Sequence, residues 1–197
     1  MKVAVIKYNA GNVQSVLYAL ERLGASAELT DDWETIQNAD KVIFPGQGEA
    51  STAMRYLSAK NLNKLIPSLK QPFFGVCLGQ QLLCAYSEEN NTTCLGVFPV
   101  QVKKFKPVSS QEHKVPHVGW NALTQLKSPL LKGLEDPAYV YYVHSYYCED
   151  SPYTIANTHY VHDFAALMHR DNFYAMQAHP EKSGAVGERI LQNFLDL

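Results

Sequence analysis

The sequence lacks the features that mark membrane proteins, secreted precursors and polyanion-binding proteins. No apolar run approaches the length of a membrane-spanning helix, and the apolar stretch within Met1–Lys7 is too short for a signal peptide. Lys+Arg 17 against Asp+Glu 19 leaves a formal net charge of -2, so no overall field favours nucleic acid or anionic lipid. We therefore predict a cytoplasmic protein with no nucleic-acid or membrane partner.

Cysteines are few, and the chain has no Gly/Ser-rich hinge, internal repeat or low-complexity tract. The four cysteines, at positions 77, 84, 94 and 148, show no Cys-x-x-Cys spacing, so reduced thiols are expected. His159 and His162 are spaced by three but have no third ligand nearby in the sequence, so no metal site is predicted. A length of 197 residues with 46% hydrophobic residues predicts one domain over residues 1–197.

Short apolar strands alternate with amphipathic helices along the first half of the chain, which favours a parallel sheet. The expected strands are Lys2–Tyr8, Ser26–Leu29, Lys41–Phe44 and Phe73–Val76. The expected helices are one between a cap at Asn12 and an end at Gly24, one at Ala50–Ala59, one at Leu78–Tyr86, and a last one capped by Ser183. From about Val97 to Tyr147, β-branched and aromatic runs broken by prolines predict added antiparallel strands.

A single cysteine occupies a conspicuous position between an expected strand and an expected helix. Cys77 follows the strand Phe73–Val76, and glycines at 75 and 79 flank it. This pattern is typical of a nucleophile elbow with sulfur in place of a hydroxyl. The helix N-terminus would favour the thiolate, and the backbone N–H of Leu78 would face a developing oxyanion. The competing interpretation is a small buried core residue, which is how we interpret Cys84.

A cysteine nucleophile needs a base that accepts its proton and later protonates the leaving amine, and histidine suits both tasks. Among the seven histidines, His179 stands out because it ends the alternating strand Tyr174–Ala178 and precedes Pro180 and Glu181. The proline fixes the intervening backbone, so the Glu181 carboxylate can turn toward the second ring nitrogen. The competing interpretation is an unrelated His and Glu on the surface.

Taken together, these residues resemble the class I, or triad-type, glutamine amidotransferases. The resemblance rests on Gly75-Val76-Cys77-Leu78-Gly79-x-Gln81, His179-Pro180-Glu181 and Phe44-Pro45-Gly46-Gln47-Gly48. It implies an α/β three-layer sandwich with a mostly parallel central sheet plus added antiparallel strands. It also implies a Cys77–His179–Glu181 triad that hydrolyses glutamine without cofactor or metal, and an oxyanion hole formed by the backbone N–H groups of Gln47 and Leu78. The competing interpretation of residues 44–48 is an ordinary Pro-Gly turn.

Within that class, the chain resembles the family of glutaminase subunits of imidazole glycerol phosphate synthase over nearly its whole length. The segments that carry this likeness are Tyr8-Asn9-Ala10-Gly11-Asn12 with Ser15, Pro116-His117-Val118-Gly119-Trp120-Asn121, Val143-His144-Ser145-Tyr146-Tyr147 and His179-Pro180-Glu181-Lys182-Ser183. The likeness implies a heterodimer in which ammonia passes to a (β/α)8-barrel synthase subunit. That subunit makes imidazole glycerol phosphate and an aminoimidazole carboxamide ribotide in histidine biosynthesis.

The same resemblance assigns further roles, residue by residue. It gives the binding of L-glutamine to Gly48, Gln81, Glu89, Ser145 and Tyr146, and the partner interface to Asn12, Trp120 and Lys182. A carboxylate at Glu89 suits the substrate ammonium. The competing interpretations are a solvated charge beside Glu88 and a core position for Trp120. The chain departs from the family pattern at Gln47, at Glu49-Ala50 and at Gln80.

Two alternative functions compete with this hypothesis, one within the same enzyme class and one outside it. One is a glutaminase that serves another pathway, such as pyridoxal phosphate or anthranilate synthesis, against which residues 116–121 argue. The other is a catalytically silent binding protein on the same fold, in which Cys77 is a structural or redox-sensing thiol. The presence of Cys77, His179 and Glu181 together argues against that interpretation.

Overall fold

The computed structural model describes residues 1–8, 13–108 and 113–197. The strands of its largest sheet are β1 Lys2–Ile6, β2 Ser26–Thr30, β3 Lys41–Phe44, β4 Phe73–Val76, β11 Thr154–Tyr160, β12 His162–Arg170 and β13 Phe173–Met176. This 7-stranded sheet has the order β11-β12-β13-β4-β3-β1-β2. From β2 to β13 its strands run parallel, and β12 and β11 extend it by antiparallel pairing.

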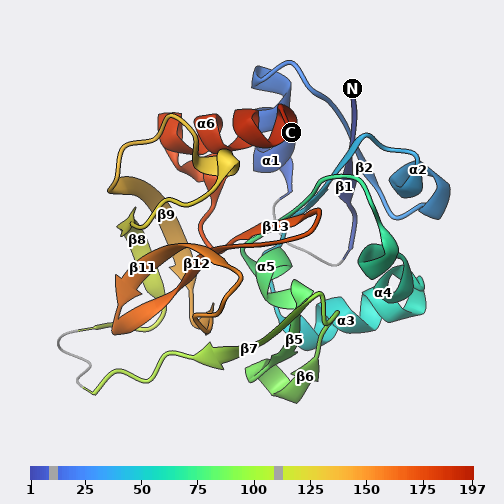
Figure 1. Ribbon diagram of the computed structural model, residues 1–197. Helices are drawn as coiled ribbons and strands as arrows, with labels where there is room; N and C mark the ends of the chain where they lie inside the picture. Colours follow the sequence, from blue (N-terminus) through green and yellow to red (C-terminus); the bar gives the residue numbers. More distant parts are fainter. Residues whose placement is uncertain (9–12, 109–112) are drawn as a thin grey trace.

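Helices cover both faces of the sheet (Figure 1). The helices are α1 Gln14–Arg22, α2 Trp33–Gln37, α3 Ala50–Ala59, α4 Leu62–Leu65, α5 Leu78–Leu83 and α6 Gly184–Leu195, with 3-10 turns η1 Ile66–Ser68, η2 Glu89–Asn91, η3 Pro129–Leu131 and η4 Pro180–Lys182. Helices α1 and α6 pack on one face, and α2 to α5 pack on the other. The result is a three-layer α/β sandwich.

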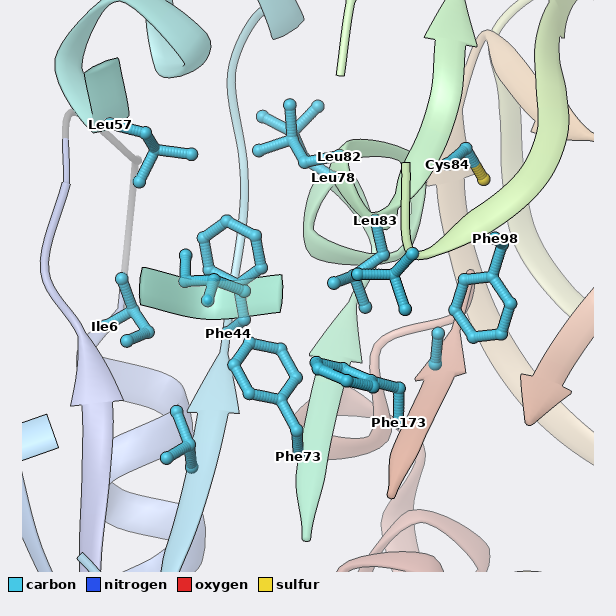
Figure 2. Close-up of a cluster of buried hydrophobic side chains, with 14 of the residues drawn as sticks. Ile6, Phe44, Leu57, Phe73, Leu78, Leu82, Leu83, Cys84, Phe98 and Phe173 are labelled. Carbon is cyan, nitrogen blue, oxygen red and sulfur yellow. The ribbon is translucent and has the colours of Figure 1, made fainter. Parts of the chain in front are cut away.

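Strand alternation divides the apolar side chains between the two faces, because successive residues of a strand point to opposite sides. Ile6, Phe44 and Phe73 enter the core beneath α3 to α5, and Figure 2 shows them lined up with Phe173. The Phe44 and Phe73 rings lie 5.9 Å apart, and the Phe73 and Phe173 rings 5.2 Å apart. The adjacent residue Phe74 enters the opposite core, where its ring lies 5.2 Å from that of Phe194 on α6. The strands are thus apolar on both faces, as buried parallel strands must be.

Two smaller sheets lie beside the sandwich. They contain β5 Cys84–Ser87, β6 Thr92–Thr93, β7 Phe98–Lys104 and β10 Tyr146–Cys148 in one, and β8 His117–Leu123 with β9 Ala138–His144 in the other. Pairing is antiparallel except between β5 and β7, which run parallel. These sheets confirm the expected added antiparallel strands, and the β5–β7 pair is the exception to that expectation.

The elements differ from the sequence prediction in a few places. The helix expected at Leu78–Tyr86 ends at Leu83, because Cys84 starts β5 and pairs with Phe98 of β7. Cys84 nevertheless lies in the core, as predicted. Ser183 precedes α6 but its side chain does not cap the helix. The cap expected at Asn12 lies outside the described residues.

Two general observations concern the described part of the chain. No helix within residues 1–8, 13–108 and 113–197 is long and apolar enough to cross a membrane. The same residues contain no group of three or more His, Cys, Asp or Glu side chains arranged to hold a metal ion. His159, one of the two histidines considered above, bonds instead through Nδ1 to Asp163 at 2.7 Å.

Candidate active site

Cys77 sits at the sharp turn between β4 and α5, at the carboxyl edge of the parallel strands. Its backbone has φ 52 and ψ -108, a conformation that residues other than glycine rarely adopt, and its N–H donates to the Met176 carbonyl at 2.8 Å. A Cβ on Gly79 would stand 2.0 Å from the carbonyl oxygen of Phe44, so only glycine lets α5 approach β3 this closely. This is the strand–turn–helix context that the elbow pattern predicted.

His179 approaches the same place from β13, the strand next to β4. Its backbone N–H donates to the Tyr141 carbonyl at 2.9 Å, and the hydroxyl of Ser183 donates to the His179 carbonyl at 2.6 Å. The same Ser183 hydroxyl accepts the N–H of Tyr141 at 2.9 Å, which explains why it does not cap α6. The backbone of His179 is therefore held from both sides.

Glu181 and His179 form a buried pair. Nδ1 of His179 lies 2.8 Å from Oε1 of Glu181, and the two side chains are only 2% and 3% exposed. The opposite ring nitrogen, Nε2, is buried, and no oxygen or nitrogen of the described residues hydrogen-bonds to it. Nδ1 is thus bonded to the carboxylate, whereas Nε2 remains available to exchange a proton with another group.

The charges around His179 favour its protonated form. Burial alone would lower the pKa of His179, but the charge and hydrogen bonding of the Cys77 sulfur, followed by those of Glu181, outweigh it and raise the pKa to about 10. An imidazolium therefore faces the cysteine sulfur at neutral pH.

A cavity of about 540 Å³ opens over Cys77, which is large enough for an amino acid. It is lined by residues from the elbow, from residues 47–48 and from the β9–β10 connection: Gln47, Gly48, Cys77, Leu78, Gln81, Glu89, Pro116, Tyr141, Val143, His144, Ser145, Tyr146 and Lys182. Each residue that the sequence suggested for glutamine binding or for the oxyanion hole lines this cavity. His179 and Glu181 lie buried behind its wall.

Glu89 lies at the wall of the cavity, where a hydrogen bond to the backbone holds its side chain. Its Oε2 accepts the backbone N–H of Ala50 at 2.7 Å, and its partial burial raises the pKa of its carboxyl group. The neighbouring Glu49 caps α3 through Ser51 N–H and also accepts from Asn90 Nδ2 at 2.7 Å. The interpretation of Glu89 as a solvated surface charge is wrong, because this carboxylate is fixed beside the cavity.

A family model described as glutamine amidotransferase class-I matches residues 4–197. A curated relative from Bacteroides thetaiotaomicron, named "Imidazole glycerol phosphate synthase subunit HisH", is 56% identical over 197 residues and covers 100% of both chains. The chain belongs to the HisH family of class-I glutamine amidotransferases. A HisH protein of Colwellia psychrerythraea is 42% identical in an alignment of 212 positions that covers 100% of this chain and 93% of that protein.

Solved structures place the HisH-family chain in the same fold class. The crystal structure of a glutamine amidotransferase superposes with a TM-score of 0.71 at 20% identity, covering 98% of this chain and 97% of that one. That of a glutamine amidotransferase from Thermotoga maritima superposes with a TM-score of 0.66 at 14% identity, covering 100% and 83%. At these identities the likeness concerns the fold alone. The predicted fold and the predicted enzyme class, glutamine amidotransferase, are confirmed.

Of the three residues expected at the partner interface of this HisH-family chain, two lie within the described residues. Asn12 lies outside the described residues. Trp120 is 56% exposed on β8, so its interpretation as a core residue is wrong. Its ring lies edge-on to that of Tyr141 at 6.2 Å, and Tyr141 and Lys182 both line the cavity.

Two residues that sequence reasoning did not assign to the site make hydrogen bonds to it in this HisH-family chain. Gln177 is fully buried, and its Nε2 lies 3.6 Å from the Cys77 sulfur. Tyr8 donates its hydroxyl to the Pro45 carbonyl at 2.6 Å, and this bond anchors residues 44–48. A signal for Gln177 was present, because a polar residue between Met176 and Ala178 in an otherwise apolar strand implies a buried partner.

Proposed function

We propose that this chain hydrolyses L-glutamine to glutamate and ammonia, and that it passes the ammonia to a (β/α)8-barrel synthase subunit. The partner would use it to make imidazole glycerol phosphate and an aminoimidazole carboxamide ribotide in histidine biosynthesis. The observation that carries the proposal is that Cys77 lines a cavity of amino-acid size and is the neighbour of the buried His179–Glu181 pair, in a HisH-family chain. The reaction needs neither cofactor nor metal.

In the first half-reaction, the Cys77 thiolate attacks the side-chain amide carbon of glutamine. A carbon–sulfur bond forms, and the negative charge moves to the amide oxygen. The N–H groups of Leu78 and Gln47, which both line the cavity, are the proposed donors to that oxygen. The carbon–nitrogen bond then breaks as the His179 imidazolium gives its proton to the departing ammonia, and this leaves a thioester.

In the second half-reaction, neutral His179 takes a proton from water as the water attacks the thioester. The collapse of the intermediate expels the sulfur as thiolate, restores the imidazolium and releases glutamate. Glu181 keeps the ring in one tautomer and orientation throughout, because its carboxylate holds Nδ1 at 2.8 Å. The raised pKa of His179 suits the first half-reaction, in which a proton donor is required.

The amino-acid end of glutamine is proposed to lie at the other end of the cavity. Glu89 supplies a carboxylate for the substrate ammonium, and the backbone at Ser145 and Tyr146 supplies groups for the substrate carboxylate. Gly48 and Gln81 complete the wall between these groups and the sulfur. This placement leaves the side-chain amide over Cys77.

The test replaces the proposed nucleophile and measures glutamine-dependent and ammonia-dependent synthesis separately. Cys77→Ala, assayed with the barrel synthase subunit, is expected to lose glutamine-dependent synthesis by a factor on the order of 10⁴ or more. Synthesis driven by added ammonium salt is expected to stay at the wild-type rate, because the partner's chemistry is untouched. Cys94→Ala is the matched control, since this thiol is half-buried and does not line the cavity.

Three outcomes would redirect the proposal. Glutamine-dependent turnover retained by Cys77→Ala would remove this sulfur from the chemistry. Wild-type glutamate production that responds to the synthase of another pathway, and not to the barrel subunit, would support a glutaminase of that pathway. Absence of glutamate with every partner would support a silent binding protein.

A further inference from the structure

Two histidines outside the proposed triad form a direct hydrogen bond in the interior. His117 of β8 and His144 of β9 are cross-strand neighbours, and Nδ1 of the first lies 2.9 Å from Nε2 of the second. Their residues are 3% and 6% exposed. His117 is also stacked on Tyr160 with the ring centroids 3.9 Å apart. The pair lies beside the cavity, and His144 contributes to its wall.

The neighbouring groups fix where the protons lie in this pair. Nδ1 of His144 is 2.7 Å from the carbonyl oxygen of Tyr146, which can only accept, so Nδ1 carries a hydrogen. Burial lowers the pKa of His144 to about 3 and that of His117 to about 4, so both rings are neutral. His144 Nε2 is then a bare acceptor, and Nδ1 of His117 must donate to it.

The outer end of the pair agrees with this assignment. Nε2 of His117 is then an acceptor, and Nδ2 of Asn121 lies 3.3 Å from it. The same Nδ2 donates to the His159 carbonyl at 2.9 Å, while Oδ1 of Asn121 accepts the Ala122 N–H at 2.8 Å. The orientation of the Asn121 amide is therefore set independently of the histidines.

At the inner end of the pair, the hydrogen bonds continue from Tyr146 to Cys77, the proposed nucleophile. The Tyr146 carbonyl accepts a second hydrogen bond, from Nε2 of Gln81, at 3.0 Å. The same Nε2 donates to Oε1 of Gln177 at 2.9 Å, and Nε2 of Gln177 lies 3.6 Å from the Cys77 sulfur. One unbroken series of hydrogen bonds therefore runs from Asn121 on β8 to the sulfur, with a consistent donor and acceptor at every link.

We propose that the neutral His117–His144 pair is a positioning device for the glutamine site, which fixes the Tyr146 carbonyl and thereby Gln81 and Gln177 against the nucleophile. The inference rests on the proposed function, because it concerns how the same cavity is shaped for glutamine. Its physical basis is that each hydrogen bond of the series has one possible donor and one possible acceptor. A protonated or wrongly tautomeric ring would set two donors or two acceptors face to face in a dry interior, so only one arrangement is compatible with burial.

The strand that carries His117 has a second role in this arrangement. Along β8, His117, Gly119 and Asn121 alternate with Val118 and Trp120, which are 55% and 56% exposed. His117 and Asn121, at inward positions, belong to the hydrogen-bonded series, and Trp120, at an outward position, belongs to the expected partner interface. A partner seated on that interface would thus act on a strand whose other side orients the glutamine site.

The test compares two nearly isosteric replacements, His144→Asn and His144→Leu, by the labelling of Cys77. The asparagine side chain retains a donor N–H near the former Nδ1, whereas the leucine side chain has none. Each full chain, with excess barrel subunit, is treated with a diazoketone analogue of glutamine and separately with iodoacetamide, and adducts are counted by intact mass. Other thiols interfere little, because Cys84 and Cys148 are fully buried and burial raises the pKa of Cys94 to about 12.

For His144→Leu we expect labelling by the glutamine analogue to slow about tenfold, while the iodoacetamide rate stays within about twofold of wild type. His144→Asn is expected to keep the analogue rate within about threefold of wild type. His169→Leu is the matched control and should change neither rate. Its ring also bonds a carbonyl two residues on, Asp171, at 2.8 Å, and stacks on Tyr174, but it lies at the opposite end of β12 and β13 from the site.

Three results would overturn the inference. These are equal slowing in the asparagine and leucine variants, equal slowing with both reagents, and no slowing at all. If His144→Leu does not fold, His117→Phe gives the same test from the other end, since it keeps the stack on Tyr160 and removes the donor to His144. An analogue rate equal to wild type in that variant also overturns it. A wild-type chain labelled by iodoacetamide but not by the analogue would instead refute the proposed glutamine site itself.

Discussion

At the scale of single residues, the charge state of His179 decides what the proposed site can do. Its pKa, raised to about 10 chiefly by the Cys77 sulfur against the opposing effect of burial, keeps the ring protonated at neutral pH. The proton that ammonia needs is therefore present before glutamine binds. Protonation is lost only as the pH rises through about 10.

Glu181→Gln tests how far the carboxylate supports this state. Removing the negative charge lowers the pKa of His179, so the alkaline fall in ammonia release should move to lower pH. The rate at neutral pH should drop by a factor on the order of 10² to 10⁴, because the ring also loses its fixed tautomer. Single-turnover ammonia release measured across this pH range gives both quantities.

The matched control is Glu188→Gln, which removes an exposed carboxylate paired with Arg22 at 3.1 Å. That variant should keep the wild-type rate and the wild-type alkaline limb. An unshifted alkaline limb in Glu181→Gln, with the rate reduced, would mean that Glu181 orients the ring without sustaining its charge.

At the scale of elements, the elbow depends on the close approach of α5 to β3. Gly79→Ala would place a methyl group 2.0 Å from the Phe44 carbonyl oxygen, a backbone atom that cannot move away without shifting β3. We expect the free energy of unfolding to fall by roughly 1–3 kcal/mol or more, as for an overpacked core, with loss of glutamine hydrolysis. Urea denaturation measures the first effect.

Gly24→Ala serves as the control for this prediction. Gly24 has φ +72 and nothing within 4 Å of a Cβ, so its replacement costs only the left-handed conformation, about 1–2 kcal/mol. Hydrolysis should be retained in that variant. A Gly79→Ala protein that keeps full hydrolysis would show that α5 tolerates displacement.

Local patterns predicted the elements whose partners are nearby, and long-range pairing decided the rest. The bounds of β3, β4 and α3 match the predicted ranges because each is a short apolar or amphipathic run between clear breaks. The end of α5 was missed because Cys84 is drawn into β5 by its pairing with Phe98. Gln177 and Tyr8 were missed as site residues for the same reason, since Gln177 meets Cys77 from 100 positions away and Tyr8 meets Pro45 from 37 positions away.

At the scale of the whole molecule, two exposed tryptophans lie on different sides. Trp120 on β8 is 56% exposed and contacts Tyr141 of the cavity wall, and Trp33 on α2 is 42% exposed. Figure 1 shows β8 and α2 on opposite sides of the molecule. On the proposed function, Trp120→Ala should weaken binding of the barrel subunit by tenfold or more, roughly the effect of losing an aromatic anchor. Titration calorimetry measures the affinity.

Trp33→Ala is the control with the same change of side chain. It should leave the affinity for the barrel subunit unchanged, because α2 packs against β1 and β8 against β11, which lie far apart in the large sheet. Unfolding should be little affected by Trp120→Ala, since more than half of that side chain already contacts solvent. Equal losses of affinity in both variants would place the partner interface elsewhere.

The position of β13 also governs when the site comes into being. This strand is inserted between β4 and β12, yet it is translated about 100 residues after the elbow it completes. A nascent chain that has folded only as far as α5 therefore carries Cys77 without its imidazolium. On the proposed function, the sulfur is activated only once the late strand docks, so an incomplete polypeptide on the ribosome would have no means of consuming glutamine.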